Sequence, residues 1–174
     1  MGFSTALGEF LIRHPQHASV LADASELAEA PSARRMRTAM LKAVSADPQV
    51  ADPVAKAGPE SLNALRIEYR RQLAGIAWRD ISATATMESV GTWLSDLADA
   101  TLEAALAIAR AEVGPQAAAC RFAVIGMGKC GGRELNYASD VDVIFVAEVS
   151  DDSTQKMSLT QEPPLDGVRS DGVA

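Results

Sequence analysis

Apolar residues recur at the helical period from Phe3 to about Glu112, in a stretch rich in Ala and Leu and punctuated by prolines. This pattern predicts several helices separated by proline-marked turns. The clearest helix is expected over residues 61–79, with apolar positions at Leu62, Leu65, Tyr69, Leu73, Ile76 and Ala77. A second is expected over residues 87–111, ended by Gly114 and Pro115, with a stripe of Val90, Leu94, Leu97, Thr101 and Ile108.

The pattern changes after Pro115 from helical to strand-like. Residues 121–128 (RFAVIGMG) and 140–148 (DVDVIFVAE) are short, β-branched and bounded by glycine or polar residues, which predicts two strands. From Val149 onward the apolar periodicity disappears, which is typical of loop or disorder. The sequence therefore predicts an α+β chain with a helical region at 1–115, a strand and glycine-loop region at 116–149, and a disordered or non-native tail at 150–174.

Composition narrows the possible functions. The 174 residues are 48% hydrophobic, as expected for a folded protein. The net charge of −7 argues against sequence-independent binding of nucleic acid. No apolar run approaches the ~20 residues of a membrane span, and the N-terminus lacks a signal-peptide pattern. Cys120 and Cys130 lack the spacing of a zinc site, so a reduced, cytoplasmic setting is the simplest expectation.

The stretch GMGKCGG, residues 126–132, has the glycine spacing of a dinucleotide-binding loop, with Glu148 near the distance of a ribose-binding acid. However, only RELNYAS separates Gly132 from Asp140. A parallel crossover needs about ten to twelve residues, so a full Rossmann helix does not fit. A P-loop is also excluded, because Lys129 is not followed by Ser or Thr.

Asp140 and Asp142 occupy alternate positions near the start of the second predicted strand, so their carboxylates are expected to point the same way. Two like charges on one face repel unless a cation lies between them. Magnesium suits this set, because it is typically held by one or two carboxylates together with phosphate oxygens. The glycine-rich turn would offer backbone N–H groups to those phosphates. The pattern favours a phosphoryl- or nucleotidyl-transfer site, with a solvated strand end as the alternative.

Residues 126–145, GMGKCGGRELNYASDVDVIF, resemble the nucleotidyltransferase signature of the glutamine synthetase adenylyltransferase and adenylyl-removing family. Residues 65–81 and 92–106 also resemble the helical region before that signature, so the likeness covers about residues 7–148. The resemblance implies a DNA polymerase β-like core, of which 116–149 would be a part. In that core a glycine pair precedes a short helix and a strand that carries the metal ligands. The implied positions are Gly131 and Gly132 for the pair, Asp140 and Asp142 for the ligands, and Ser139, Lys129 and Arg133 for phosphate contacts.

The resemblance also implies an activity. One domain of the family adds AMP from ATP to a tyrosine of glutamine synthetase, and the other removes it by phosphorolysis, releasing ADP. The residue pattern of the signature, close to the N-terminus, favours the removing half. The expected cofactor is Mg²⁺, and the expected substrates or products are ATP or ADP and inorganic phosphate.

Polymerase β-like sites generally use a third carboxylate on a later strand, and Asp166 is a poor substitute because its neighbours are not strand-like. We therefore expect a fragment with weak or absent catalysis and an unpaired sheet edge. Two alternatives remain open: an NAD-binding module built on the same glycines, and a helical docking module for glutamine synthetase or a PII-type signalling protein.

Overall fold

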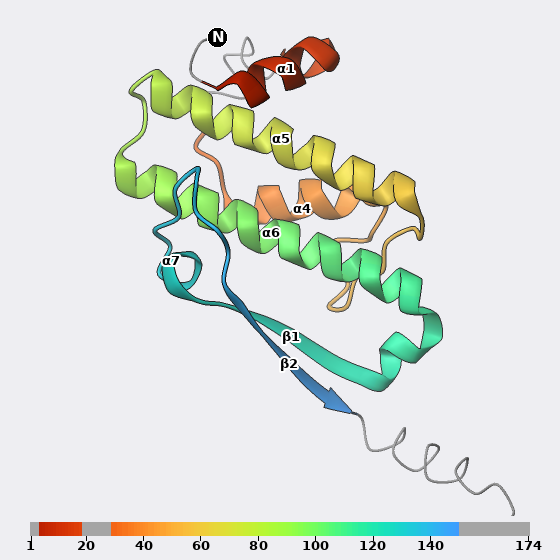
Figure 1. Ribbon diagram of the computed structural model, residues 1–174. Coiled ribbons are helices and arrows are strands. Elements are labelled where there is room, and N and C mark those ends of the chain that lie inside the picture. The colour runs from red at the N-terminus through yellow and green to blue at the C-terminus, as the bar shows by residue number, and fades with distance from the viewer. Residues whose placement is uncertain (1–3, 19–28, 150–174) are drawn as a thin grey trace, which may run out of the picture.

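The computed structural model describes residues 4–18 and 29–149, which form a helical layer followed by a strand pair (Figure 1). The helical elements in chain order are α1 (Thr5–Arg13), the 3-10 helix η1 (Pro15–Ala18), α4 (Ala33–Ala43), α5 (Pro59–Ile81), α6 (Met87–Val113) and the 3-10 helix η2 (Gly114–Ala119). The last elements are strand β1 (Cys120–Gly126), the short helix α7 (Gly128–Gly131) and strand β2 (Val143–Val149).

Both predicted long helices are confirmed, and each is slightly longer than its pattern indicated. Helix α5 begins with Pro59, whose fixed φ and missing N–H suit the first helical position. Thr86 caps α6 by accepting a hydrogen bond from the backbone N–H of Ser89 at 3.2 Å. Gly114 ends α6 at φ +75°, a conformation that glycine adopts without strain.

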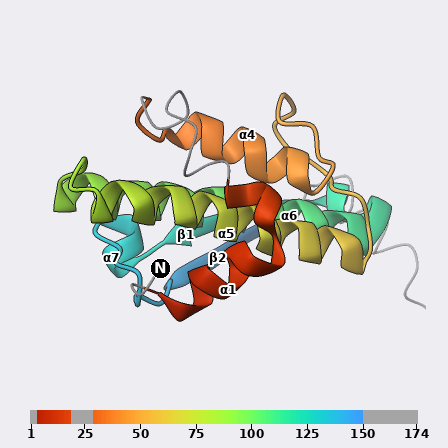
Figure 2. The same ribbon diagram turned by 90° about the horizontal axis from the view of Figure 1, so that it is seen from above.

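The main core lies between α4, α5 and α6, which contact one another pairwise. Helix α1 packs on the outer side of α5, as the view from above shows (Figure 2). Most of the predicted apolar stripes are buried in this core, but Leu62 and Tyr69 of α5 remain partly exposed, at 38% and 37%. The buried stripe residues are Leu65, Ile76, Ala77, Val90, Leu94, Leu97 and Ile108.

Two polar contacts add specific links to this apolar packing. Arg37 of α4 donates from Nε and Nη2 to the two carboxylate oxygens of Glu103 on α6, at 2.7 and 2.6 Å. Arg110, near the end of α6, forms an ion pair of 2.6 Å with Asp52 in the segment before α5. The bidentate Arg37–Glu103 pair fixes geometry as well as charge.

Strands β1 and β2 form an antiparallel pair whose register runs from Cys120 opposite Val149 to Gly126 opposite Val143. The two predicted strands are thus confirmed, although β2 begins three residues later than the sequence pattern suggested. In the described part of the chain each strand has a single neighbour, so each leaves one edge unpaired. The architecture is α+β, while a polymerase β-like core needs more strands than this pair and stays a prediction.

The strand pair keeps much apolar surface in contact with solvent. Phe145 is 63% exposed, and its ring stacks on that of Phe122 across the pair, with centroids 5.7 Å apart. The other exposed large apolar side chains of the two strands are Ile125, Ile144 and Val146. Such a patch is typical of a surface that another protein element covers.

Within residues 4–18 and 29–149, no helix combines the length and the apolar character that a membrane span requires.

Candidate functional site

The glycine turn, residues 126–132, carries the chain from the end of β1 into the short helix α7. Gly128 has φ +52°, which favours glycine, and the N–H of Gly131 donates to the carbonyl of Met127 at 3.0 Å. A Cβ at position 131 would lie 2.5 Å from the carbonyl oxygen of Gly126, so only glycine fits there without backbone movement. The turn therefore depends on glycine for both conformation and close approach.

The position of the glycine pair differs from the expectation based on the family resemblance. We expected Gly131 and Gly132 to precede the short helix, but Gly131 is the last residue of α7 and Gly132 is its C-cap. The N–H of Gly132 donates to the carbonyl of Gly128 at 2.9 Å and closes the helical turn. The N–H of Gly132 is thus used within α7 itself, because the helix is a single turn long.

The segment that carries the two aspartates lies beside the glycine turn. The N–H of Met127 donates to the carbonyl of Asp142 at 2.8 Å, one position beyond the last strand pair, Gly126 and Val143. The carboxylate oxygen Oδ2 of Asp142 lies 3.6 Å from the position that a Cβ on Gly128 would take. The backbone therefore brings Asp142 directly against the turn.

One structural premise about the aspartates is wrong. Asp140 and Asp142 precede β2, which begins at Val143, so strand alternation does not fix their relative orientation. Both aspartate side chains are exposed.

The donor set fits part of a magnesium site. In the described part of the chain, no basic side chain forms an ion pair with Asp140 or Asp142, so both carboxylates are open to a cation. Two carboxylates with solvent access suit magnesium, which keeps several of its waters. Among the described residues no three His, Cys, Asp or Glu side chains are grouped to hold a metal. The ligands present therefore supply at most part of a coordination shell.

Arg133 makes contacts that the sequence did not predict. It has φ +60°, and its guanidinium group donates to Asp96 on α6 and lies 3.7 Å from Asp99. Burial raises the pKa of the Asp99 carboxyl, and Arg133 opposes that shift. In this structure Arg133 therefore binds the helical layer, and its role as a phosphate contact stays a prediction.

The other two predicted phosphate contacts have different surroundings. Lys129 is exposed on α7. Ser139 closes a small turn: its Oγ accepts from the N–H of Asn136 at 3.2 Å, and its N–H donates to the carbonyl of Asn136 at 3.1 Å. The hydroxyl oxygen is thus already an acceptor, while its hydrogen is free to donate to a phosphate.

Cys130 has a packing role. The side chain is 5% exposed and belongs to the same core cluster as α4, α5 and α6. Burial raises the pKa of its thiol, which disfavours the nucleophilic thiolate. Cys120, at the far end of β1, is also a free thiol.

Sequence reasoning missed a second contact between the loop and the helices. The phenol of Tyr137 donates to Asp80, near the end of α5, at 3.0 Å. Neither residue belongs to a recognisable motif, and they are far apart in the sequence. Their proximity follows from packing of the loop on the helical layer.

The strand geometry contradicts the dinucleotide alternative. A Rossmann unit needs parallel strands, whereas β1 and β2 are antiparallel. Glu148, considered as a ribose-binding acid, lies opposite Arg121 at the end of the strand pair away from Gly126 and forms an ion pair of 3.2 Å with it.

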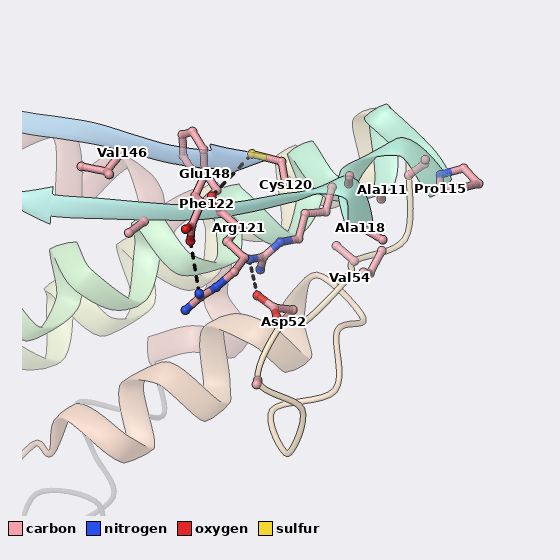
Figure 3. Close-up of a pocket in the computed structure, with 17 residues that line it drawn as sticks. Asp52, Val54, Ala111, Pro115, Ala118, Cys120, Arg121, Phe122, Val146 and Glu148 are labelled. Carbon is pink, nitrogen blue, oxygen red and sulfur yellow. Dashed lines mark hydrogen bonds and ion pairs between the residues drawn. The ribbon is translucent and has the colours of Figure 1, made fainter. Parts of the chain in front are cut away.

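A pocket of about 940 Å³ lies at that same far end of the strand pair (Figure 3). Its walls come from the segment before α5, the end of α6, η2 and both strands, and many of the lining side chains are alanines. Its two arginines, Arg110 and Arg121, each pair with an acid, Asp52 and Glu148 respectively. None of the residues predicted for the glycine turn or the aspartate segment lines it, so the pocket is separate from the glycine turn.

Comparison with known proteins identifies the family. The family model described as glutamate-ammonia ligase adenylyltransferase matches residues 1–162. The chain belongs to this family. The resemblance found in the signature at residues 126–145 is thereby confirmed, and it extends over the helical layer as well.

Curated relatives of this adenylyltransferase family member carry one common name, bifunctional glutamine synthetase adenylyltransferase/adenylyl-removing enzyme. A relative from Streptomyces avermitilis is 44% identical over 148 residues, covering 85% of this chain and 13% of the relative. One from Bifidobacterium longum is 43% identical over 164 residues, covering 91% and 15%. One from Streptomyces coelicolor is 59% identical over 87 residues, covering 50% and 9%. This chain thus spans a small part of the length of these relatives.

Replacing Gly131 by alanine tests the close approach in the glycine turn. We expect Gly131→Ala to lower the free energy of unfolding by more than ~1 kcal/mol, because the new Cβ would lie 2.5 Å from a backbone oxygen. Gly132→Ala is the matched control, since its Cβ would meet the Gly128 carbonyl at 3.2 Å and needs a smaller adjustment. Urea unfolding of both variants measures the difference, and equal costs would contradict the tight contact.

The phenol of Tyr137 provides a pH test of the loop–helix contact. Burial, followed by its hydrogen bond to Asp80, raises the pKa of Tyr137 well above its ordinary value. Because the folded state holds this proton more tightly, the contact's contribution to stability is complete below about pH 10 and is lost as the pH rises further.

We expect Asp80→Asn to lower the pKa of Tyr137, as measured by phenolate absorbance, with Tyr137→Phe identifying its signal against that of Tyr69. An unchanged titration in Asp80→Asn would contradict the hydrogen bond.

Proposed function

We propose that the glycine turn and the Asp140–Asp142 segment form part of a magnesium-dependent nucleotidyl-transfer site. The observation that carries this proposal is the backbone hydrogen bond of 2.8 Å between Met127 and Asp142, which brings a carboxylate against the turn. The family membership supports it, because the matched relatives are named as adenylyltransferases.

Each residue has a role in this proposal. Asp140 and Asp142 hold Mg²⁺, which when bound neutralises charge on the phosphate oxygens. Gly131 and Gly132 let the backbone approach the phosphates closely, since neither carries a side chain. The Ser139 hydroxyl donates to a phosphate oxygen, and exposed Lys129 contributes a positive charge nearby. Arg133 contacts phosphate only if it releases Asp96.

We further propose that the whole protein acts on glutamine synthetase, and that this part belongs to the half that removes AMP from a tyrosine by phosphorolysis. The names of the relatives support the substrate, since they include both adenylyltransferase and adenylyl-removing activities. The signature G-M-G-K-x-G-G-x-E-L-N supports the removing half. Inorganic phosphate and the adenylylated tyrosine are then the substrates, and ADP is the product.

The arrangement of the described residues supports weak activity for this chain by itself. The third carboxylate expected of a polymerase β-like site has no counterpart among the described residues, where no group of three potential ligands occurs. Asp166 lies outside the described residues. An incomplete ligand set lowers metal affinity and leaves the charge of the transferred phosphate less well neutralised.

Metal-dependent nucleotide binding tests the proposed site. We expect calorimetry to show Mn²⁺-dependent binding of ADP by this chain, weakened at least about tenfold in Asp142→Asn because a ligand charge is lost. Glu148→Gln is the matched control, as it removes an exposed acid at the opposite end of β2. Binding that is equal in all three proteins, or NAD binding that needs no metal, would contradict the proposal.

The direction of the reaction needs a separate measurement. With adenylylated glutamine synthetase and inorganic phosphate, and with this chain in excess, we expect slow ADP release above the background of Asp142→Asn. AMP incorporation from ATP instead of ADP release would contradict the assignment to the removing half. Absence of both reactions would contradict catalysis by this chain, while the binding experiment still decides whether it carries the metal site.

A further inference from the structure

We propose that Asp96 of α6 is a positioning residue, which holds Arg133 and thereby fixes the glycine turn and the segment that carries Asp142. The importance of this contact for metal binding rests on the proposed function, but the contact itself is testable without it. Asp96 lies outside the glycine signature.

Asp96 is buried, so its carboxylate needs a charged or hydrogen-bonding partner. It is 8% exposed, and it is one of the few buried polar residues in the described part of the chain. A buried charge is costly unless it is paired and hydrogen-bonded. The guanidinium group of Arg133 supplies that partner, and it also lies near Asp99, one turn further along α6.

The backbone around Arg133 lies close to the same helix. A Cβ added at Gly91 would be 3.4 Å from the carbonyl oxygens of both Arg133 and Leu135, so the loop lies directly on α6 at that point. Leu135 is buried in the core shared by the helices. Three neighbouring contacts, one charged, one through backbone and one apolar, therefore fix the loop to α6.

The contacts continue from Arg133 into the glycine turn. The N–H of Arg133 donates to the carbonyl of Cys130 at 3.1 Å, and the N–H of Glu134 donates to that of Lys129 at 2.8 Å. These bonds join the loop to α7, which is bonded in turn to Met127.

Met127 completes the path, because its N–H donates to the carbonyl of Asp142. A short path of hydrogen bonds thus connects Asp96 to the aspartate segment. The backbone of Arg133, at φ +60°, also departs from the usual region for a non-glycine residue. Such a conformation persists where surrounding contacts hold it.

Hydrogen exchange of this chain directly tests whether the contact between Asp96 and Arg133 holds the loop. In Asp96→Asn we expect the amides of Gly132, Arg133 and Glu134 to exchange about tenfold faster, because the loop opens more often when the charge pair is lost. Exchange in α4 should stay unchanged. Glu103→Gln is the matched control, since it breaks a different ion pair of α6, the one between Glu103 and Arg37 of α4. Equal exchange of these amides in wild type and Asp96→Asn would overturn the proposal.

A second variant keeps the test decisive if Asp96→Asn does not fold. Arg133→Asn removes the guanidinium group from a half-exposed side chain and retains a residue that tolerates positive φ. We expect the same acceleration, and no additional acceleration in the double variant, because both changes remove one interaction. Additive effects would overturn the pairing. Arg133→Lys, which keeps the charge but loses the planar fork, should show partial recovery.

Mn²⁺ affinity, measured by calorimetry on the same variants, tests whether the Asp96–Arg133 contact affects the proposed metal site. We expect a several-fold weaker affinity in Asp96→Asn and an unchanged affinity in Glu103→Gln, although neither residue contacts the metal. Unchanged affinity with accelerated exchange would overturn the positioning role. If wild type itself binds no Mn²⁺, the proposed function fails, whereas the exchange data still decide whether Asp96 holds the loop.

Discussion

The packing of the loop after Gly132 on helix α6 is the constraint on which the candidate site depends. Gly91 permits the backbone to approach, Asp96 pairs with Arg133, and Leu135 is buried in the core. The same helix provides the buried face against α4 and α5. Helix α6 therefore joins the stability of the helical layer to the geometry of the glycine turn, because one element contributes to both.

The strand pair is joined to the helical layer at both ends of β1, through η2 and through the glycine turn. Near Gly126 it is joined to the helical core through the glycine turn, in which Cys130 is buried. Along its length, apolar side chains such as Phe145 and Ile144 face solvent, and each strand has one neighbour in the described part of the chain. An isolated two-stranded pair is marginally stable in water.

The surroundings of three predicted phosphate contacts show why the glycine signature does not by itself fix what each of its residues binds. Arg133, adjacent to the glycine pair, is bound by an acid 37 residues earlier in the sequence. Ser139 accepts a hydrogen bond within its own turn, and Lys129 is exposed on α7. The signature places these residues close together along the chain, whereas their partners depend on which helix the loop packs against.

The sequence by itself determined the two long helices, the two strands and the family. Periodicity, β-branched runs and the signature at 126–145 are local properties, and they persist whatever the chain packs against. Only the tertiary structure decided that the strands are antiparallel, that the aspartates precede β2, and that Asp96 and Asp80 hold the loop. These features depend on contacts between residues far apart in sequence, which no local pattern specifies because packing of the whole chain selects them.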